Sequence, residues 1–480
     1  MKKIIIAVLA LCFVNQLNAQ DIAGNWVGKI AVSGINIRLV LNIKKTSDTS
    51  YSSTVDSPDQ KAFGIPCNAT YIKKDSLFVA IAAIRGGYRG IWDGKDSISG
   101  TFRQGANITL NLKRVTDAEK AALSQDIVRP QTPKPPYNYY TEDVEYNNAS
   151  SSMHYGATFT RPNGSGKYPA VIIISGSGTQ DRDGAMMGAR GHKPYWVLAD
   201  YLTKNGIAVL RVDDRGAGKS SLGDAINSKT TLDFSYDVEA SLNYLETRTD
   251  VDKSHLGLIG HSEGGVIAPM VAARRKDISF IVLWGAPAAG GPEVLTGQYA
   301  RPLRQQGLDS TAINAFKQLN LRVLNLFASS ANTGVLDQNI ATVFDAWKKA
   351  QSKKTLTALN IQDNALQNAF KTYNGLYNNP WYRYFISYAP SKDLSKLTCS
   401  VLAINGQKDT QVLAGENLAK IKEILTKSGN KDFETVAIPN LNHLLQTAIT
   451  GDMSEYETIN ETMSPVAMNI ICSWIKLHTK

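Results

Sequence analysis

The spacing of apolar and polar residues predicts two kinds of structure along this chain. Between Trp26 and Leu112, short runs alternate apolar and polar side chains, and turn signals such as Asp93-Gly94 separate them. A period of two is typical of strands that bury one face. The pattern predicts about eight strands in an antiparallel sandwich or small closed barrel. They are expected at 27–32, 35–43, 51–55, 70–72, 77–81, 88–92, 97–102 and 108–112.

After Tyr140 the chain alternates between strands and helices. Continuous apolar runs rich in β-branched residues predict strands that are buried on both faces, and amphipathic stretches lie between them. Such alternation is typical of an α/β fold with a mostly parallel, doubly wound sheet. The expected strands are 171–175, 207–212, 256–260, 278–284, 400–404 and 433–438, and the expected helices include 194–204, 231–248 and 463–478.

One long segment between Gly285 and Cys399 interrupts this alternation. Its periodicity is helical, with helices expected at 319–327, 340–350 and 356–372. The segment ends in an aromatic cluster that comprises Trp381, Tyr382, Tyr384, Phe385 and Tyr388. We interpret it as a helical cap inserted at about 288–395, over the carboxyl ends of the strands.

The amino-terminal residues predict export. Lys2 and Lys3 precede an apolar run over 4–14, and Ala19 closes a segment that is too short to span a bilayer as a helix. We expect a cleaved signal peptide and a periplasmic or secreted protein. Leu11 stands before Cys12, where a lipidation site needs a small residue, so we expect no lipid anchor. No later apolar run reaches roughly 18 residues, so no stable membrane anchor is expected.

The connection between the two regions is rich in proline. Four prolines between Arg129 and Pro136 favour an extended, semi-rigid spacer. The expected organisation is a signal peptide at 1–19, an antiparallel β domain at 20–115, a Pro-rich linker at 116–140 and an α/β domain at 141–480 that carries the cap.

Composition and charge exclude several classes of protein. Hydrophobic residues make up 43% and charged residues 20%, which excludes a wholly disordered chain. The net charge of +10 is scattered, and no basic block is interleaved with aromatics, so we favour a solvated surface over a nucleic-acid, anionic-polymer or membrane face. Cys67, Cys399 and Cys472 lack metal-ligand spacing, so we expect buried thiols, at most one disulfide and no metal site.

A strong candidate nucleophile lies in Gly260-His261-Ser262-Glu263-Gly264-Gly265. The G-x-S-x-G pattern alone is weak, but here an expected strand enters it and an expected helix leaves it. A serine on such a sharp strand-to-helix turn has its hydroxyl exposed, and the flanking glycines avoid a clash in the turn. The alternative interpretation is a glycine-rich structural turn.

Two later loops offer the partners that a serine nucleophile needs, which are a base and a carboxylate that orients it. Asp409 follows the expected strand 400–404, and His443 follows 433–438. Parallel strands place both loops at the sheet edge where Ser262 is expected. His192 is the other loop histidine but precedes the serine, and Asp432 is a poor substitute because it begins a strand.

An oxyanion hole is expected after the first strongly buried strand, at Ser175-Gly176-Ser177-Gly178. The backbone amides of Ser177 and Glu263 are the candidate donors. A phosphate-binding loop is the alternative, but a Walker lysine and a full G-x-G-x-x-G are missing. The charged loops 181–183 and 213–216 at the same edge are interpreted as an ion-pair network that braces the site.

Taken together, these motifs resemble bacterial serine hydrolases of the α/β-hydrolase fold with an inserted helical cap, over residues 140–480. That group includes carboxylesterases, dienelactone-hydrolase-like and serine-aminopeptidase-like proteins. The resemblance implies that Ser262 is the nucleophile, Asp409 the acid and His443 the base, with amides forming the oxyanion hole. One departure is Ser175, where many relatives carry histidine.

We therefore expect an exported carboxylesterase that cleaves small acyl esters through a Ser-His-Asp triad and an acyl-enzyme, because an aromatic rim favours an apolar acyl pocket. A peptidase, aminopeptidase or amidase with the same triad is the alternative. A non-catalytic ligand-binding protein is the second alternative. The chemistry requires no cofactor, and we expect none. Substrate identity, oligomeric state and the role of the β domain do not follow from the sequence.

Overall fold

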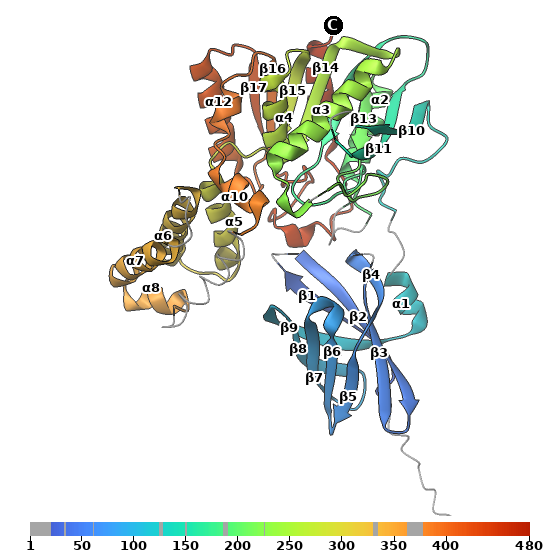
Figure 1. Ribbon diagram of the computed structural model, residues 1–480, viewed down its shortest axis with the longest axis vertical. Coiled ribbons are helices and arrows are strands. Elements are labelled where there is room, and N and C mark those ends of the chain that lie inside the picture. Colours follow the sequence, from blue (N-terminus) through green and yellow to red (C-terminus); the bar gives the residue numbers. More distant parts are fainter. Residues whose placement is uncertain are drawn as a thin grey trace, which may run out of the picture. The chain divides into compact units, whose positions relative to one another are not determined.

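The computed structural model describes residues 21–32, 35–60, 62–123, 128–148, 151–185, 191–224, 226–329, 335–361 and 378–480. Its contacts divide the chain into two compact units, Met1–Asp126 and Ile127–Lys480 (Figure 1). The expected signal peptide and residues 362–372 of the expected helix 356–372 lie outside the described residues. Among the described residues, no helix is both long and apolar enough to cross a bilayer.

The first unit contains one antiparallel sheet in the order β4-β3-β2-β1-β9-β8-β7-β6-β5. Its strands are β1 (Gly24–Val32), β2 (Ile35–Ser47), β3 (Ser50–Ser57), β4 (Ala62–Pro66), β5 (Ala69–Lys73), β6 (Ser76–Ile81), β7 (Gly86–Trp92), β8 (Ser97–Gln104) and β9 (Ala106–Val115). Two short 3₁₀ turns, η1 (Pro58–Gln60) and η2 (Ala82–Ile84), and helix α1 (Asp117–Leu123) complete it.

This sheet curls toward a barrel rather than forming a two-sheet sandwich. Alternate residues, including the fully buried Trp26, gather into one core inside the curl. The two ends of the sheet approach each other, because the Cys67 amide donates to the Ser53 carbonyl at 3.0 Å and the Ser53 and Thr70 hydroxyls lie 2.6 Å apart. The expectation of an antiparallel β domain is confirmed. The sequence pattern misses β4, which pairs with β3 at only three positions.

The second unit is built on an eight-stranded sheet in the order β10-β11-β13-β12-β14-β15-β16-β17. The strands are β10 (Tyr139–Asn147), β11 (His154–Pro162), β12 (Tyr168–Ile174), β13 (Ala208–Val212), β14 (Val251–His261), β15 (Ile278–Trp284), β16 (Ser400–Gly406) and β17 (Phe433–Ile438). Pairing is antiparallel at β10/β11 and β11/β13 and parallel elsewhere, so the predicted mostly parallel sheet is confirmed.

Helices cover both faces of this sheet because its strands are apolar on both faces. Val171 and Ile173 belong to one apolar core with residues of the helices 194–204 and 465–477, whereas Ile172 and Ile174 belong to the core on the other face with residues of the helices 231–247, 264–274 and 414–428. The bounds of these helices are α2 (Pro194–Lys204), α3 (Thr231–Thr247), α4 (Gly264–Arg274), α12 (Ala414–Ser428) and α13 (Pro465–Leu477), and two 3₁₀ turns are η3 (Ile226–Ser228) and η4 (Met453–Glu455).

The segment between β15 and β16 is helical throughout its described part. Its helices are α5 (Gly291–Gln305), α6 (Ser310–Ser329), α7 (Leu336–Lys349), α8 (Lys353–Ala358), α10 (Pro380–Ser387) and α11 (Ser391–Leu394). They have an apolar core of their own, in which Tyr382 and Ile386 of α10 meet Phe327 of α6 and Ile340 of α7. Tyr382, one residue of the expected aromatic cluster, is therefore buried among the cap helices.

The start of the second unit, within the expected Pro-rich linker 116–140, is bound to the rest of this unit by two side chains. The Arg129 guanidinium is buried and donates to the backbone carbonyls of Tyr456, at 3.0 Å, and of Ile459. The Gln131 amide donates to the Met463 carbonyl at 2.7 Å and accepts from the Thr462 amide. We call Arg129 and Gln131 the strap.

Candidate active site

Ser262 lies on a tight turn between β14 and α4. Its φ of +53° is in the left-handed region, which is unusual for a residue with a side chain. A Cβ on Gly260 would come within 2.1 Å of the Gly264 carbonyl oxygen, so the turn needs glycine at that position. The Ser262 amide donates to the Trp284 carbonyl of β15 at 2.9 Å. The unusual backbone conformation of Ser262 is therefore supported by the tight glycine turn and by the hydrogen bond to β15.

Asp409 and His443 form a buried pair. They lie in the loops after β16 and β17, and Nδ1 of His443 is 2.6 Å from Oδ2 of Asp409. Only 2% of Asp409 and 3% of His443 are exposed to solvent. The other carboxylate oxygen, Oδ1, accepts the amides of Gln411 and Val412 at 2.8 Å. These bonds fix the carboxylate, which in turn orients the imidazole.

Ser262 and the Asp409–His443 pair meet at the end of β15. Trp284, whose carbonyl holds the Ser262 amide, also donates its indole N–H to the His443 carbonyl at 3.0 Å. A Cβ on the next residue, Gly285, would lie 3.1 Å from the His443 ring. The three sequence-predicted side chains thus share one sheet edge. Among the described residues no hydrogen bond joins the Ser262 hydroxyl to His443, and such bonds often form only when substrate is present.

Two backbone amides beside Ser262 have no acceptor within the described part of the chain. They are the amides of Ser177 and Glu263, the two candidate oxyanion donors. The neighbouring Gly176 amide, in contrast, donates to the Tyr195 hydroxyl at 3.2 Å. The loop lies close to the turn, since a Cβ on Gly176 would be 3.2 Å from the Ser262 Cβ. Unpaired amides near a nucleophile can receive a developing negative charge.

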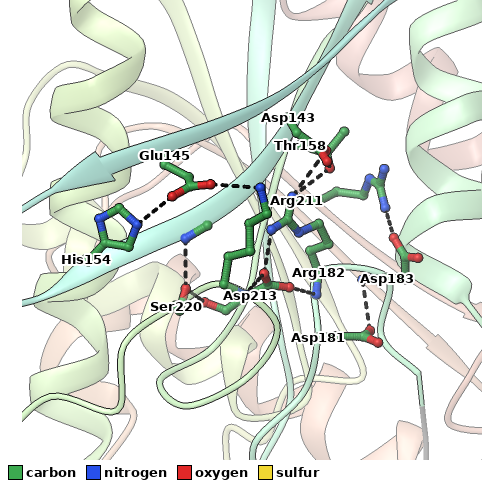
Figure 2. Close-up of polar contacts among 12 residues, drawn as sticks. Asp143, Glu145, His154, Thr158, Asp181, Arg182, Asp183, Arg211, Asp213 and Ser220 are labelled. Carbon is green, nitrogen blue, oxygen red and sulfur yellow. Dashed lines mark hydrogen bonds and ion pairs between the residues drawn. The ribbon is translucent and has the colours of Figure 1, made fainter.

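A network of ion pairs lies at the same edge, beyond the end of β13 (Figure 2). Nη2 of Arg182 is 2.5 Å from the buried carboxylate of Asp213, and its Nη1 is 3.3 Å from Asp143. Asp213 also accepts the amides of Arg182 and Lys219. Arg211 pairs with Asp183. We call these residues the paired-charge network, and they confirm the ion-pair interpretation for Arg182, Asp183 and Asp213.

Asp214, directly after Asp213, is expected in the same ion-pair network, but it has different contacts. Its carboxylate accepts the Ser175 hydroxyl at 2.7 Å and the Gln180 amide at 2.9 Å, and no ion-pair partner is found for it within the described ranges. Burial raises the pKa of Asp214 to about 7. Arg215 pairs instead with Asp237 of α3, at 2.6 Å.

A cavity of about 620 Å³ opens beside the Ser262 turn. Its wall combines apolar side chains with Arg215, Lys229 and the carboxyl groups of Asp213, Asp214, Asp237 and Glu263. Asp213 and Asp237 pair with arginines, whereas Asp214 and Glu263 have no ion pair within the described residues, and we call these two the cavity carboxylates. Burial also raises the pKa of Glu263. The expected apolar acyl or aryl pocket stays a prediction, and residues at the strand ends add carboxyl groups to the apolar wall of this cavity. The lining includes Ile172, Ile174, Phe234, Val238, Asp214, Glu263, Asn379, Pro380 and Trp381.

Comparison with known proteins identifies the family. The profile of the serine aminopeptidase S33 family matches residues 192–447, more than half of the chain. The chain belongs to this S33 family of α/β-hydrolases. The match includes Ser262, Asp409 and His443, and begins after the Ser177 loop.

Individual relatives of this S33 hydrolase are more distant. Esterase EstD from Thermotoga maritima is 27% identical over 186 residues, which cover 39% of this chain and 41% of that protein. Among solved structures, an esterase of Pyrococcus furiosus is 16% identical with a TM-score of 0.42, over 74% of this chain and 99% of its own. Est1E from Butyrivibrio proteoclasticus is 15% identical with a TM-score of 0.39, over 70% and 98%.

The alternative site residues lie elsewhere in the S33 hydrolase. His192 is fully buried and bonds to the Thr462 carbonyl at 3.0 Å, and burial lowers its pKa to about 3. Asp432 contacts Ser400 and His478. Neither contacts the Asp409–His443 pair.

The cysteines and the side chains that commonly bind metals can be located in the part of the chain that the structure describes. No group of three His, Cys, Asp or Glu side chains there has the arrangement of a metal site. Cys67, Cys399 and Cys472 are free thiols, of which only Cys472 is fully buried.

Proposed function

We propose that this protein is an exported serine hydrolase that cleaves carboxylic esters through an acyl-enzyme. The observation that carries the proposal is the buried 2.6 Å contact between Asp409 and His443, beside a serine held at a left-handed φ on a strand-to-helix turn. Membership in a hydrolase family supports the same chemistry.

The proposed reaction begins with attack of Ser262 Oγ on the acyl carbonyl carbon. Asp409 accepts Nδ1–H of His443, which leaves Nε2 free to take the serine proton. The oxyanion of the tetrahedral intermediate accepts hydrogen bonds from the backbone amides of Ser177 and Glu263. When the ester C–O bond breaks, His443 gives this proton to the departing alkoxide oxygen, which leaves as an alcohol. A water molecule then attacks the acyl-enzyme with His443 again as base, and the carboxylic acid departs.

An aminopeptidase that uses the same groups is the second candidate. Asp214 and Glu263 have no cationic partner within the described residues, and both line the cavity. A carboxylate in such a place would attract the ammonium group of an amino-acyl substrate. Ester cleavage stands first because the curated relative that matches this chain is named an esterase.

The test is hydrolysis of p-nitrophenyl esters of graded acyl length beside aminoacyl-nitroanilides. We expect ester turnover that falls by at least about 10⁴-fold in Ser262→Ala, because removal of the nucleophile leaves only binding and the oxyanion hole. Ser473→Ala, an exposed serine on α13, is the matched control and should behave as wild type. A fluorophosphonate probe should label Ser262, as located by peptide mass spectrometry.

The possible outcomes separate the candidates. Dominant anilide turnover would put the aminopeptidase first. Undiminished turnover in Ser262→Ala, or no turnover and no probe labelling in wild type, would refute the serine hydrolase and leave the non-catalytic ligand-binding protein.

Export is a separate part of the proposal and rests on the signal-like residues 1–19. Expression in a bacterial host should yield a periplasmic protein whose amino-terminal sequence begins at Gln20. A cytoplasmic protein that retains Met1 would contradict it.

A further inference from the structure

The Glu263 side chain has contacts that the proposed reaction does not use. Its carboxylate is buried, and one oxygen, Oε1, accepts both the Thr231 hydroxyl and the Trp381 indole N–H, each at 2.7 Å. Burial raises the pKa of Glu263, and the contacts with Thr231, Trp381 and the Ser177 side chain act against that rise. A buried carboxylate with several donors is firmly held.

These three contacts come from three separate parts of the hydrolase. Thr231 is the first residue of α3, Trp381 belongs to helix α10 of the cap, and Ser177 lies in the loop after β12. Ser177 and Glu263 are also the residues whose amides are the candidate oxyanion donors. The Glu263 carboxylate is therefore hydrogen-bonded to α3 and to the cap, and the side chain of Ser177, the residue of the other donor, also acts to lower its pKa.

We infer that the Glu263 side chain is a positioning residue of the oxyanion hole, and that Trp381 links its placement to the cap. This inference rests on the proposed serine hydrolase. Oxyanion donors must lie within about 2.7–3.1 Å of the place where the oxygen becomes charged, so a small displacement of either amide weakens stabilisation of the transition state. Through its bonds to Thr231 and Trp381, the Glu263 carboxylate restrains the residue that supplies one of these amides.

The cap contact also faces the cavity. Glu263 and Trp381 both line it, together with Asn379 and Pro380 at the start of α10. The Trp381 ring stacks on Phe385 at 5.6 Å, which holds the indole in place from within the cap. A substrate group in the cavity therefore touches the same tryptophan that holds Glu263.

The test is the variant Trp381→Phe, which keeps an aromatic ring for Phe385 and removes the indole N–H. We expect kcat for p-nitrophenyl acetate to fall about tenfold with KM unchanged, because the lost contact acts through the transition state. Binding of a trifluoromethyl ketone, which forms a tetrahedral adduct with a serine nucleophile, should weaken by the same factor. Binding of acetate, a ground-state product, should not change.

Two further variants distinguish positioning from a general effect on folding. Trp347→Phe also removes an indole hydrogen bond inside the cap, to the Ala315 carbonyl at 2.8 Å, and we expect its kcat to equal that of wild type. Glu263→Gln keeps an acceptor oxygen for Trp381 and Thr231, so it should lose less activity than Glu263→Ala. Melting temperatures of all variants show whether each one folds.

Several results would overturn the inference. They are an unchanged kcat in Trp381→Phe, a loss confined to KM with intact ketone binding, or an equal loss of kcat in Trp347→Phe. Wild-type protein without activity on any ester or anilide would instead refute the proposed function, so the two failures are distinguishable.

Discussion

Two groups of carboxylates lie at the carboxyl edge of the hydrolase sheet, and their surroundings differ. In the paired-charge network, Asp213 contacts Arg182 at 2.5 Å and accepts two backbone amides. Within the described residues, the cavity carboxylates Asp214 and Glu263 accept only neutral donors, although Asp213 borders the same cavity. Neighbouring residues of one loop thus have opposite surroundings.

The pKa values of these carboxyl groups shift in opposite directions, in line with their different surroundings. The arginine contact and the amides hold the pKa of Asp213 below its usual value despite burial. Burial without a cation raises the pKa of Asp214 and of Glu263. A carboxylate whose charge is matched inside the protein contributes to folding, whereas one whose charge is not matched is available to a ligand or to positioning. The following variants test this division.

The largest effect is expected at Asp409, a buried carboxylate whose partner is an imidazole rather than a guanidinium. Asp409→Asn keeps the shape of the side chain but favours the wrong tautomer of His443, so kcat for an ester should fall about 10³–10⁴-fold. Steady-state kinetics measure the loss of activity, and a melting curve shows whether the variant still folds. A variant that loses its fold rather than its activity would place Asp409 with the paired-charge network.

The next effect is on stability. Asp213→Ala leaves Arg182 buried without its main partner, and we expect the free energy of unfolding to fall by about 3–5 kcal/mol in urea titrations. Asp143→Ala is the matched control, because Asp143 contacts the same arginine at 3.3 Å but its side chain is 64% exposed. Its change should stay within about 1 kcal/mol. Equal changes in the two variants would contradict a special role for Asp213.

The last effect is a change in the pH dependence of stability at Asp214. The pKa of this carboxyl is about 7 in the folded protein and near 4 in an unfolded chain. Between these values the folded state keeps a proton that the unfolded state has lost, so the free energy of unfolding falls as pH rises, by at most about 1.4 kcal/mol per pH unit.

Asp214→Asn removes this contribution, and the decline between pH 4 and 7 should become shallower than in wild type. Urea titrations of both proteins across that range measure the difference. Parallel curves would show that Asp214 ionises at an ordinary pH and is matched in charge like Asp213.

The sequence predicts the order of strands and helices in the hydrolase domain, because strands that are buried on both faces are recognisable as continuous apolar runs. Runs such as Val171–Ser175 are continuously apolar, and the structure places strands there. The loops after those strands carry Ser262, Asp409 and His443, so parallel topology is enough to bring them to one edge. Their catalytic roles stay predictions. Strand β4 is missed because Gly64 and Pro66 break its alternation.

Contacts between distant residues could not be predicted in this way. Glu263 and Trp381 are 118 residues apart, and their hydrogen bond depends on how the cap helix α10 meets the body. The different surroundings of Asp213 and Asp214 likewise depend on where Arg182 and Ser175 lie after folding. Periodicity shows which face of an element is buried, but it carries no information on the partner of a buried polar group.

The strap connects the loop that carries His443 to the beginning of its domain through a series of hydrogen bonds. Arg129 and Gln131 hold the backbone of residues 456–463, and the Ser464 amide donates to the carbonyl of Leu445, two residues beyond His443. A shortened protein that begins at Tyr139 would contain every predicted catalytic residue and still leave these buried carbonyls without donors. A hydrolase unit that keeps these bonds therefore has to include Arg129, and its proline-rich start supports the loop that carries His443 as well as connecting the two units.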